Sequence, residues 1–212
     1  MLAGVWFCYM TFGLSMASLA PLVREIESDL DFSHSAMGTV LGAWQFVYIF
    51  AAIPCGILLD RIGARWGLAI GALIIGLSGI FRGFAEEYID LLIAVALFGL
   101  GGPLISAGAP KVVSERFEGK DRGLAMGIYI TGPGIGAVTA LLLTQPLILP
   151  WLEGNWRALL QIWGGVSLAA GLFWLLVAKE SPRTPDSIEG QSIMSGLVEL
   201  LRIPAVRVIL LM

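Results

Sequence analysis

Long apolar stretches alternate with short polar connections along this chain of 212 residues. A helix needs about 20 consecutive, mostly apolar residues to cross the hydrocarbon core of a bilayer. Each apolar stretch is long enough, so the pattern predicts an all-α membrane protein, a bundle of six transmembrane helices. The predicted spans are Leu2–Val23, Met37–Leu59, Trp66–Ala85, Leu91–Val113, Gly123–Leu147 and Arg157–Ala178.

Composition supports a membrane protein. Apolar residues make up 57% of the chain, charged residues 14%, and the mean hydropathy is +0.85, whereas a soluble domain has about 25% charged residues. The net charge of -3, without a basic tail or patch, argues against a nucleic-acid partner. Cys8 and Cys55 lie in apolar stretches, and with a single histidine they indicate neither a zinc site nor a disulfide framework. We therefore predict membrane lipid around the chain, no metal and no cofactor.

Six spans place the connections between helices on two sides of the membrane, and the lysines and arginines are divided unevenly between those sides. Cytoplasmic connections of membrane proteins are enriched in lysine and arginine. One face has only Arg24, Arg82 and Arg157, so the other face, together with the N-terminus, is predicted to be cytoplasmic. We expect a multi-pass protein of a plasma membrane, of the bacterial inner-membrane type. The basic residues of the predicted cytoplasmic face are Arg61, Arg65, Lys111, Arg116, Lys120, Arg122, Lys179, Arg183, Arg202 and Arg207.

The last part of the chain differs from the six spans. Residues 179–203 begin with a polar stretch and continue with apolar residues at helical spacing, which predicts a cytoplasmic linker with an amphipathic helix. Residues 204–212 begin another apolar stretch that is too short to cross a bilayer. We interpret this as a seventh helix that is cut off, so the six predicted spans, residues 1–178, would belong to a fragment of a longer protein.

The connection between the second and third spans is the most specific motif. Gly63 permits a tight turn, and Asp60 is placed to pair with a nearby arginine or to cap the next helix. The contacts of such a cluster can stabilise one conformation of a protein and be absent in another. A solvated polar turn with ordinary cytoplasmic arginines explains the same residues equally well.

This connection resembles the signature loop between helices 2 and 3 of the major facilitator superfamily, whose pattern is Gly-x-Leu-x-Asp-Arg-x-Gly-x-Arg. The resemblance implies two six-helix halves, so the chain would be the N-terminal half and its partner a missing C-terminal six-helix half. It also implies alternating access, with the Asp60 cluster stabilising the outward-open state. The matching residues are Gly56, Leu58, Asp60, Arg61, Gly63 and Arg65, with further similarity in Phe117–Gly127, which includes Arg122, in Asn155–Arg157 and in Leu200–Val206.

The fifth predicted span contains Gly132, Pro133, Gly134 and Gly136 about halfway along. Proline removes a backbone donor and glycine weakens a helix, so this segment is a candidate hinge. It is similar to a motif of proton-coupled antiporters in the same family, although Ile128 stands where that motif has a glycine. A kink that serves packing is the alternative.

Cargo contacts are expected from polar and aromatic residues on the helices that line the cavity in this family. No ionisable residue lies deep in a predicted span, so coupling to a proton or ion gradient stays open. Arg82, one turn from the outer end of the third span, either extends to the lipid headgroups or attracts an anionic solute, as in the cyanate and organic-anion branches that the chain faintly resembles. The candidate cavity residues are Tyr9, Thr11, Gln45, Tyr48, Arg82, Ser106, Tyr129 and Thr131.

The resemblance implies a secondary active transporter of a small solute, with symport and antiport both open. A half-size transporter that works as a homodimer and a regulatory remnant without transport are the alternatives. An intramembrane serine protease is disfavoured, because the Gly-x-Ser-Gly segment at Ser78 lacks a histidine on another helix. A channel is disfavoured too, because no selectivity-filter or ring-of-charge pattern occurs.

Overall fold

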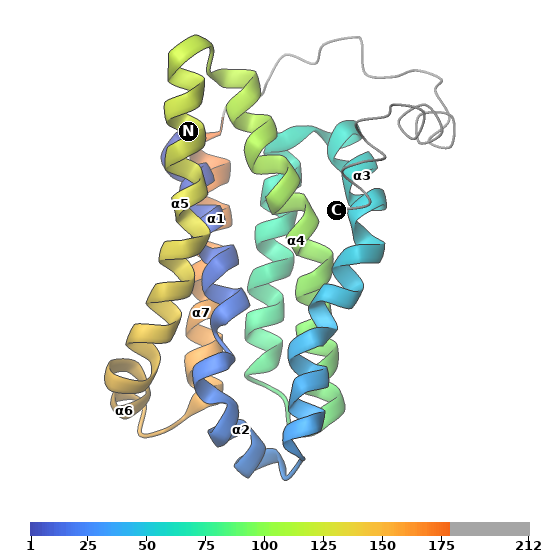
Figure 1. The fold of residues 1–212 in the computed structure, drawn as a ribbon, viewed down its shortest axis with the longest axis vertical. Helices are drawn as coiled ribbons and strands as arrows, with labels where there is room; N and C mark the ends of the chain where they lie inside the picture. Colours follow the sequence, from blue (N-terminus) through green and yellow to red (C-terminus); the bar gives the residue numbers. More distant parts are fainter. Residues whose placement is uncertain (179–212) are drawn as a thin grey trace, which may run out of the picture. The chain divides into compact units, whose positions relative to one another are not determined.

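In the computed structural model, which describes residues 1–178, long helices lie side by side in a bundle (Figure 1). The predicted linker 179–203 and the predicted helix start 204–212 lie outside the described residues. The long helices are α1 (Leu2–Ala17), α3 (His34–Arg82), α4 (Tyr88–Arg116), α5 (Gly119–Leu143) and α7 (Trp156–Val177). The short elements are η1 (Ala20–Leu22), α2 (Val23–Leu30), η2 (Thr144–Ile148) and α6 (Leu149–Trp151).

The helix α3 crosses the bundle twice. Its 49 residues would measure about 74 Å if straight, more than twice the hydrocarbon thickness of about 30 Å. Gly63 interrupts it with φ 81° and ψ 162°, a conformation that glycine adopts without strain. Figure 1 shows the two arms, residues 34–62 and 64–82, running in opposite directions. Five helices in the described part are long and apolar enough to span a membrane, and the two arms of α3 raise the crossings to the predicted six.

The two ends of the bundle differ in charge. The basic end holds the Gly63 turn, the α4–α5 connection and the end of α7, and the opposite end holds α2, residues 83–87 and α6 (Figure 1). Caps at the opposite end fix where helices begin, because the side chain of Ser33 accepts from Ala36 N and that of Asn155 accepts from Ala158 N. The described lysines and arginines of the basic end are Arg61, Arg65, Lys111, Arg116, Lys120 and Arg122.

Two spans lose regular α-helical geometry before their predicted ends. The α-helix of the first span stops at Ala17, and the chain continues through the 3-10 turn η1, which contains Pro21. The fifth span changes at Thr144 to the π-helix η2, which contains Pro146. Proline removes a backbone donor and clashes with the preceding turn, which accounts for both changes. Both irregular segments lie toward the opposite end and contact each other.

Glycines let α1 and α5 pack with their backbones in contact. A Cβ atom at Gly13 would overlap the carbonyl of Pro133, and one at Gly136 would overlap the carbonyl of Met10. Gly132 faces Trp6 O and Met10 N, whereas Gly134 faces open space. The backbone stays helical through Pro133, so bending at the predicted hinge remains a prediction, and packing is the role that the contacts support.

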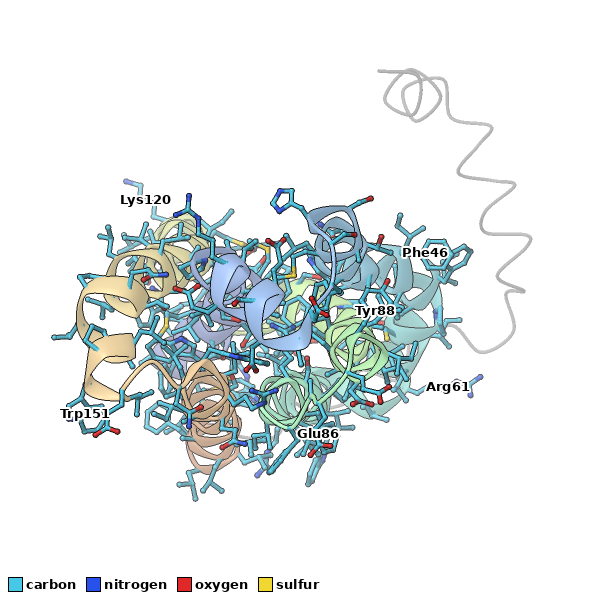
Figure 2. All side chains as sticks on the ribbon, turned by 90° about the horizontal axis from the view of Figure 1, so that it is seen from below. Phe46, Arg61, Glu86, Tyr88, Lys120 and Trp151 are labelled. Carbon is cyan, nitrogen blue, oxygen red and sulfur yellow. The ribbon has the colours of Figure 1, made fainter. Side chains whose placement is uncertain are left out.

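Large apolar side chains cover the outside of the bundle. On the first arm of α3, Phe46, Ile49 and Phe50 are each about two-thirds exposed. On α5, Ile130 and Leu142 are exposed to a similar degree. Figure 2, a view along the bundle, shows Phe46 and Trp151 at its periphery. Such a surface requires lipid or another protein against it.

The α1–α5 contact predicts unequal effects of alanine at two neighbouring glycines. Gly136→Ala inserts a Cβ atom into the backbone of α1 and should lower the free energy of unfolding by about 1–3 kcal/mol. Gly134→Ala is the matched control, since its Cβ atom meets nothing and alanine favours a helix. Thermal melting in detergent, followed by size-exclusion fluorescence, measures both. Equal melting temperatures for the two variants would contradict the assigned contact.

Candidate functional site

Six aromatic residues from four helix segments form one cluster, which we call the aromatic cluster. Ring centroids are 5.5 Å apart for Tyr9 and Tyr129, 5.8 Å for Tyr9 and Phe12, and 5.3 Å for Phe12 and Phe98. Each residue lies in the middle part of its helix, so the cluster is at mid-height in the bundle. Its members are Tyr9 and Phe12 of α1, Trp44 and Tyr48 of the first arm of α3, Phe98 of α4 and Tyr129 of α5.

Two glycines of α4 create the space for these rings. A Cβ atom at Gly99 would lie 2.5 Å from Trp44 O, so glycine lets the first arm of α3 approach α4. A Cβ atom at Gly102 would lie 2.9 Å from the Tyr48 ring. The glycine-rich middle of α4 therefore positions the aromatic rings as well as packing the helix.

The cluster has a polar part made of hydroxyl groups. The Tyr48 hydroxyl and Ser106 Oγ lie 2.7 Å apart and join the first arm of α3 to α4. Ser106 Oγ also donates to Pro103 O. With the phenols of Tyr9 and Tyr129, these groups offer both donors and acceptors beside flat apolar rings, the combination that binds small polar organic molecules.

Other predicted cavity residues lie elsewhere. Thr11 is buried and donates to Cys8 O of its own helix. Thr131 is exposed, accepts from Trp6 Nε1 and donates to Ile128 O. Gln45 is exposed beside the cluster residue Trp44. The structure therefore brings together Tyr9, Tyr48, Ser106 and Tyr129 of the predicted set.

Arg82 does not extend to lipid headgroups. Its side chain is only 2% exposed and points into the bundle, where Nη1 donates to Ser15 O at 2.9 Å and to Ser18 Oγ at 3.2 Å. Its Cζ atom lies 5.5 Å from the centroid of the Phe98 ring. Arg82 is thus an interior cation directly behind the aromatic cluster.

The signature turn at the basic end makes one contact that the sequence did not predict. Asp60 Oδ1 accepts from Lys111 Nζ at 2.6 Å, so its partner is a lysine of α4 rather than an arginine of the turn. Asp60 and Lys111 side chains are 64% and 29% exposed, so the pair contributes at most about 1 kcal/mol to stability. Arg61 and Arg122 are exposed, and Figure 2 shows Arg61 extending from the bundle.

Arg65 joins the turn to the end of α7. Its Nη2 atom donates to Leu175 O at 3.3 Å, and Trp174 Nε1 donates to Arg65 O at 2.8 Å. Leu175 is in the last turn of α7, where helix carbonyls lack intrahelical partners. A cation at a helix C-terminus is favourable because the helix dipole is negative there.

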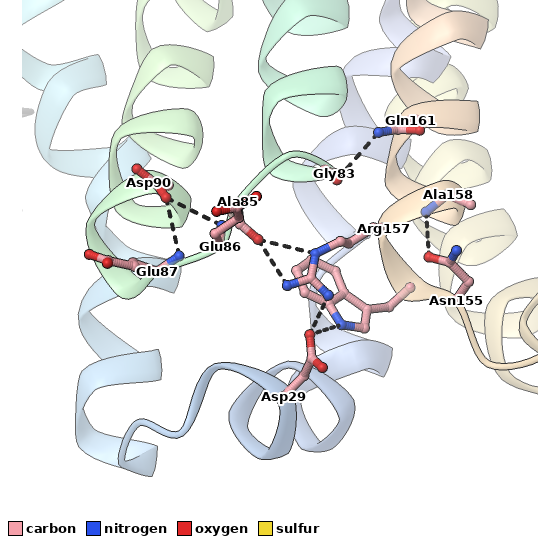
Figure 3. A network of polar contacts seen from close by, with 11 residues as sticks. Asp29, Gly83, Ala85, Glu86, Glu87, Asp90, Asn155, Arg157, Ala158 and Gln161 are labelled. Carbon is pink, nitrogen blue, oxygen red and sulfur yellow. Dashed lines mark hydrogen bonds and ion pairs between the residues drawn. The ribbon is translucent and has the colours of Figure 1, made fainter.

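A second polar network, shown in Figure 3, holds the opposite end together. Arg157 forms an ion pair with Asp29 of α2 and donates through Nε and Nη2 to Ala85 O. Gln161 Nε2 donates to Gly83 O. The hydrogen bond from Arg157 holds the pKa of the Asp29 carboxyl below its ordinary value, so this contribution to stability is lost as the pH falls through that lowered pKa.

The protease motif has a structural role. Ser78 is fully buried and donates to Ala94 O at 2.7 Å, which joins α3 to α4. His34 Nδ1 lies 2.7 Å from Glu27 Oε1 at the opposite end of the bundle.

The model of the Major Facilitator Superfamily matches residues 5–212. The chain is 26% identical to a D-galactonate transporter of Escherichia coli over 186 residues, which are 87% of this chain and 41% of that protein. It is 26% identical to a galacturonate transporter of Dickeya chrysanthemi over 186 residues, which are 86% of this chain and 52% of that protein. The chain therefore spans about half, or less, of the length of these curated relatives.

A solved structure supports the fold. The described bundle is similar to a bacterial homologue of the human lysosomal transporter Spinster in an inward-facing and unoccupied conformation, with a TM-score of 0.79 and 20% identity. The match covers 95% of this chain and 47% of that chain. The six-helix arrangement is therefore one half of a known transporter architecture.

The network at the opposite end predicts a stability effect of Arg157. Arg157→Gln removes contacts to both α2 and the α3–α4 connection and should lower the free energy of unfolding by about 1–3 kcal/mol. Arg122→Gln is the control, because Arg122 is exposed at the basic end. Thermal melting in detergent gives both values, and a loss for Arg157→Gln no larger than for Arg122→Gln would show that the network does not stabilise the fold.

Proposed function

The chain belongs to the major facilitator superfamily, and from this premise we propose that it forms the N-terminal half of a carrier that moves a sugar acid across a membrane. The aromatic cluster is the cargo-facing surface of this half. It has rings and hydroxyl groups at mid-height, where carriers of this kind bind solutes. The relatives named as D-galactonate and galacturonate transporters support a hydroxylated acid as the cargo.

The second half would cover the exposed faces of the first arm of α3 and of α5. Relatives are about twice as long as this chain. An apolar groove of about 450 Å³ on the first arm of α3, with Phe46, Phe50 and Leu100 among its lining, offers a place for helices of that half. A second copy of this chain is the alternative occupant.

The signature turn would act as a conformational latch at the basic end, which we propose to be cytoplasmic with the N-terminus. The Asp60–Lys111 pair is too exposed to hold the fold together. The pair orients the Asp60 carboxylate, and Asp60 and Arg61 are both exposed at this end, where they would contact the second half. We propose that this contact stabilises the outward-open state.

Coupling to an ion gradient would depend on groups in the second half. Within residues 1–178 no aspartate or glutamate is buried, and a carboxylate that carries protons during transport has to enter the membrane interior. This half therefore supplies cargo contacts and the latch, whereas symport, antiport and uniport are decided elsewhere.

Transport by the intact carrier tests the proposal. In proteoliposomes we expect saturable uptake of labelled D-galactonate that is inhibited by D-galacturonate and not by D-galactose. Tyr48→Phe should raise KM roughly threefold to tenfold, the value of one neutral hydrogen bond, whereas Tyr88→Phe, which alters a ring packed on Phe32 at the opposite end, should not.

Absence of uptake for both acids would contradict a sugar-acid carrier. An unchanged KM for Tyr48→Phe would contradict the assignment of the aromatic cluster as the cargo site. Transport by a dimer of residues 1–212 alone would show that a second copy of this chain takes the place of the proposed second half.

The latch predicts that charge at positions 60 and 111 affects transport more than stability. Asp60→Asn should slow uptake at least about fivefold and shift cysteine accessibility toward the inward-open state, while the melting temperature changes little, as for an exposed pair. The double variant Asp60→Lys with Lys111→Asp exchanges the two charges. It restores the ion pair but places a cation where the second half would meet the Asp60 carboxylate, so uptake should stay slow. If the double variant recovered the wild-type uptake rate, the role of Asp60 would be the ion pair with Lys111 and the latch would be contradicted.

A further inference from the structure

Arg82 is the one charged side chain among residues 1–178 that is fully inside the bundle. Ionisable residues within spanning helices are rare, and they commonly mark the path of a solute or ion. The aromatic cluster contains no ionisable group besides its phenols. Arg82 is therefore a permanent charge inside the bundle that lies against Phe98 of the aromatic cluster.

The hydrogen bonds of Arg82 position its guanidinium group but do not neutralise its charge. Its hydrogen bonds go to the carbonyl of Ser15 and the hydroxyl of Ser18, which are neutral oxygens. Within the described residues no carboxylate forms an ion pair with it, and its buried Nε atom has no hydrogen-bond partner. The end of α1 is negative, but a helix dipole has no net charge and cannot cancel a cation as a carboxylate would.

A structural cap would not need this charge. The carbonyl of Ser15 is in the last turn of α1, and a neutral donor would satisfy it. Burial of a full cation is far more costly than burial of a neutral donor. The charge itself therefore requires an explanation beyond the cap.

The position of Arg82 behind Phe98 supplies that explanation. The Phe98 ring is fully buried, lies 5.5 Å from the guanidinium and stacks on Phe12 of the cluster. Because the buried Phe98 ring lies between Arg82 and the partly exposed rings of the cluster, the arginine acts on cargo through its electric field. In a bundle interior such a field is weakened much less than in water.

We propose that Arg82 gives this carrier its preference for anionic cargo, through the field of a buried cation behind the aromatic cluster. This inference rests on the proposed function and adds the residue that selects the charge of the cargo. A sugar acid and the corresponding neutral sugar have similar hydroxyl groups, so contacts with the cluster alone discriminate weakly between them.

Neutralising Arg82 without removing it gives the sharpest test. Ser18 Oγ lies 3.2 Å from Nη1, so S18D places a carboxylate beside the guanidinium, and S18N has nearly the same shape without charge. In proteoliposomes of the intact carrier, KM for D-galactonate should be about tenfold higher for S18D than for S18N. Inhibition by D-galactose should become stronger in S18D.

Replacement of Arg82 itself gives independent evidence. R82K keeps the charge and should stay within about threefold of the wild-type KM, whereas R82Q keeps a donor for Ser15 O without charge and should match S18D. Arg157→Gln is the control for general destabilisation, because it weakens the opposite end far from the cluster and should leave KM unchanged.

Each outcome has one meaning. Equal KM values for S18D and S18N, or a wild-type KM for R82Q, would overturn the proposal and leave Arg82 as a cap of α1. If R82Q does not fold, the S18D and S18N pair decides. Absence of D-galactonate uptake by the wild-type carrier would instead overturn the proposed function.

Discussion

Helix ends in an apolar medium leave backbone carbonyls without partners, and the arrangement of this bundle depends on how those carbonyls are satisfied. The last turns of a helix have no intrahelical donors, and lipid supplies none. In this chain, arginines from neighbouring helices donate to carbonyls at or just beyond three helix ends, where they also meet the negative end of a dipole. The contacts are Arg65 with Leu175 O, Arg82 with Ser15 O and Arg157 with Ala85 O.

These contacts join the second arm of α3 to α1 and to α7 at both ends of the bundle. The backbone contact at Gly13 and Gly136 adds α5 to the same unit. The arginine contacts thus lie toward the two ends of the bundle, and the aromatic cluster lies between them. That arrangement suits the proposed half-carrier, which would move as one body while its centre contacts cargo, since the three arginines that join the helices make no contact with the hydroxyl groups of the cluster.

The sequence predicted the features that depend on position along a helix. The six crossings, the Gly63 turn and the basic end all follow from apolar length, glycine and lysine or arginine placement. The rotation of each helix about its own axis was harder to predict, because a span that is apolar on all sides has no clear period of polar and apolar residues. Thr11 and Thr131 therefore turned out to lie away from the cluster, and Arg82 was expected at the headgroups or the outer mouth rather than behind Phe98. The sequence places Lys111 among the basic residues of one end, but its pairing with Asp60 depends on the packing of α3 against α4.

Distances between spin labels within this half test most directly whether it moves as one body. Met16 of α1 and Ile162 of α7 are exposed positions on helices that the interior contacts hold together. In the intact carrier, the distance between labels at these two sites should be the same with and without bound D-galactonate, while a label in the second half moves relative to both. A change in the distance from position 16 to position 162 between the two states would contradict a rigid half and would place the motion of transport inside the bundle itself.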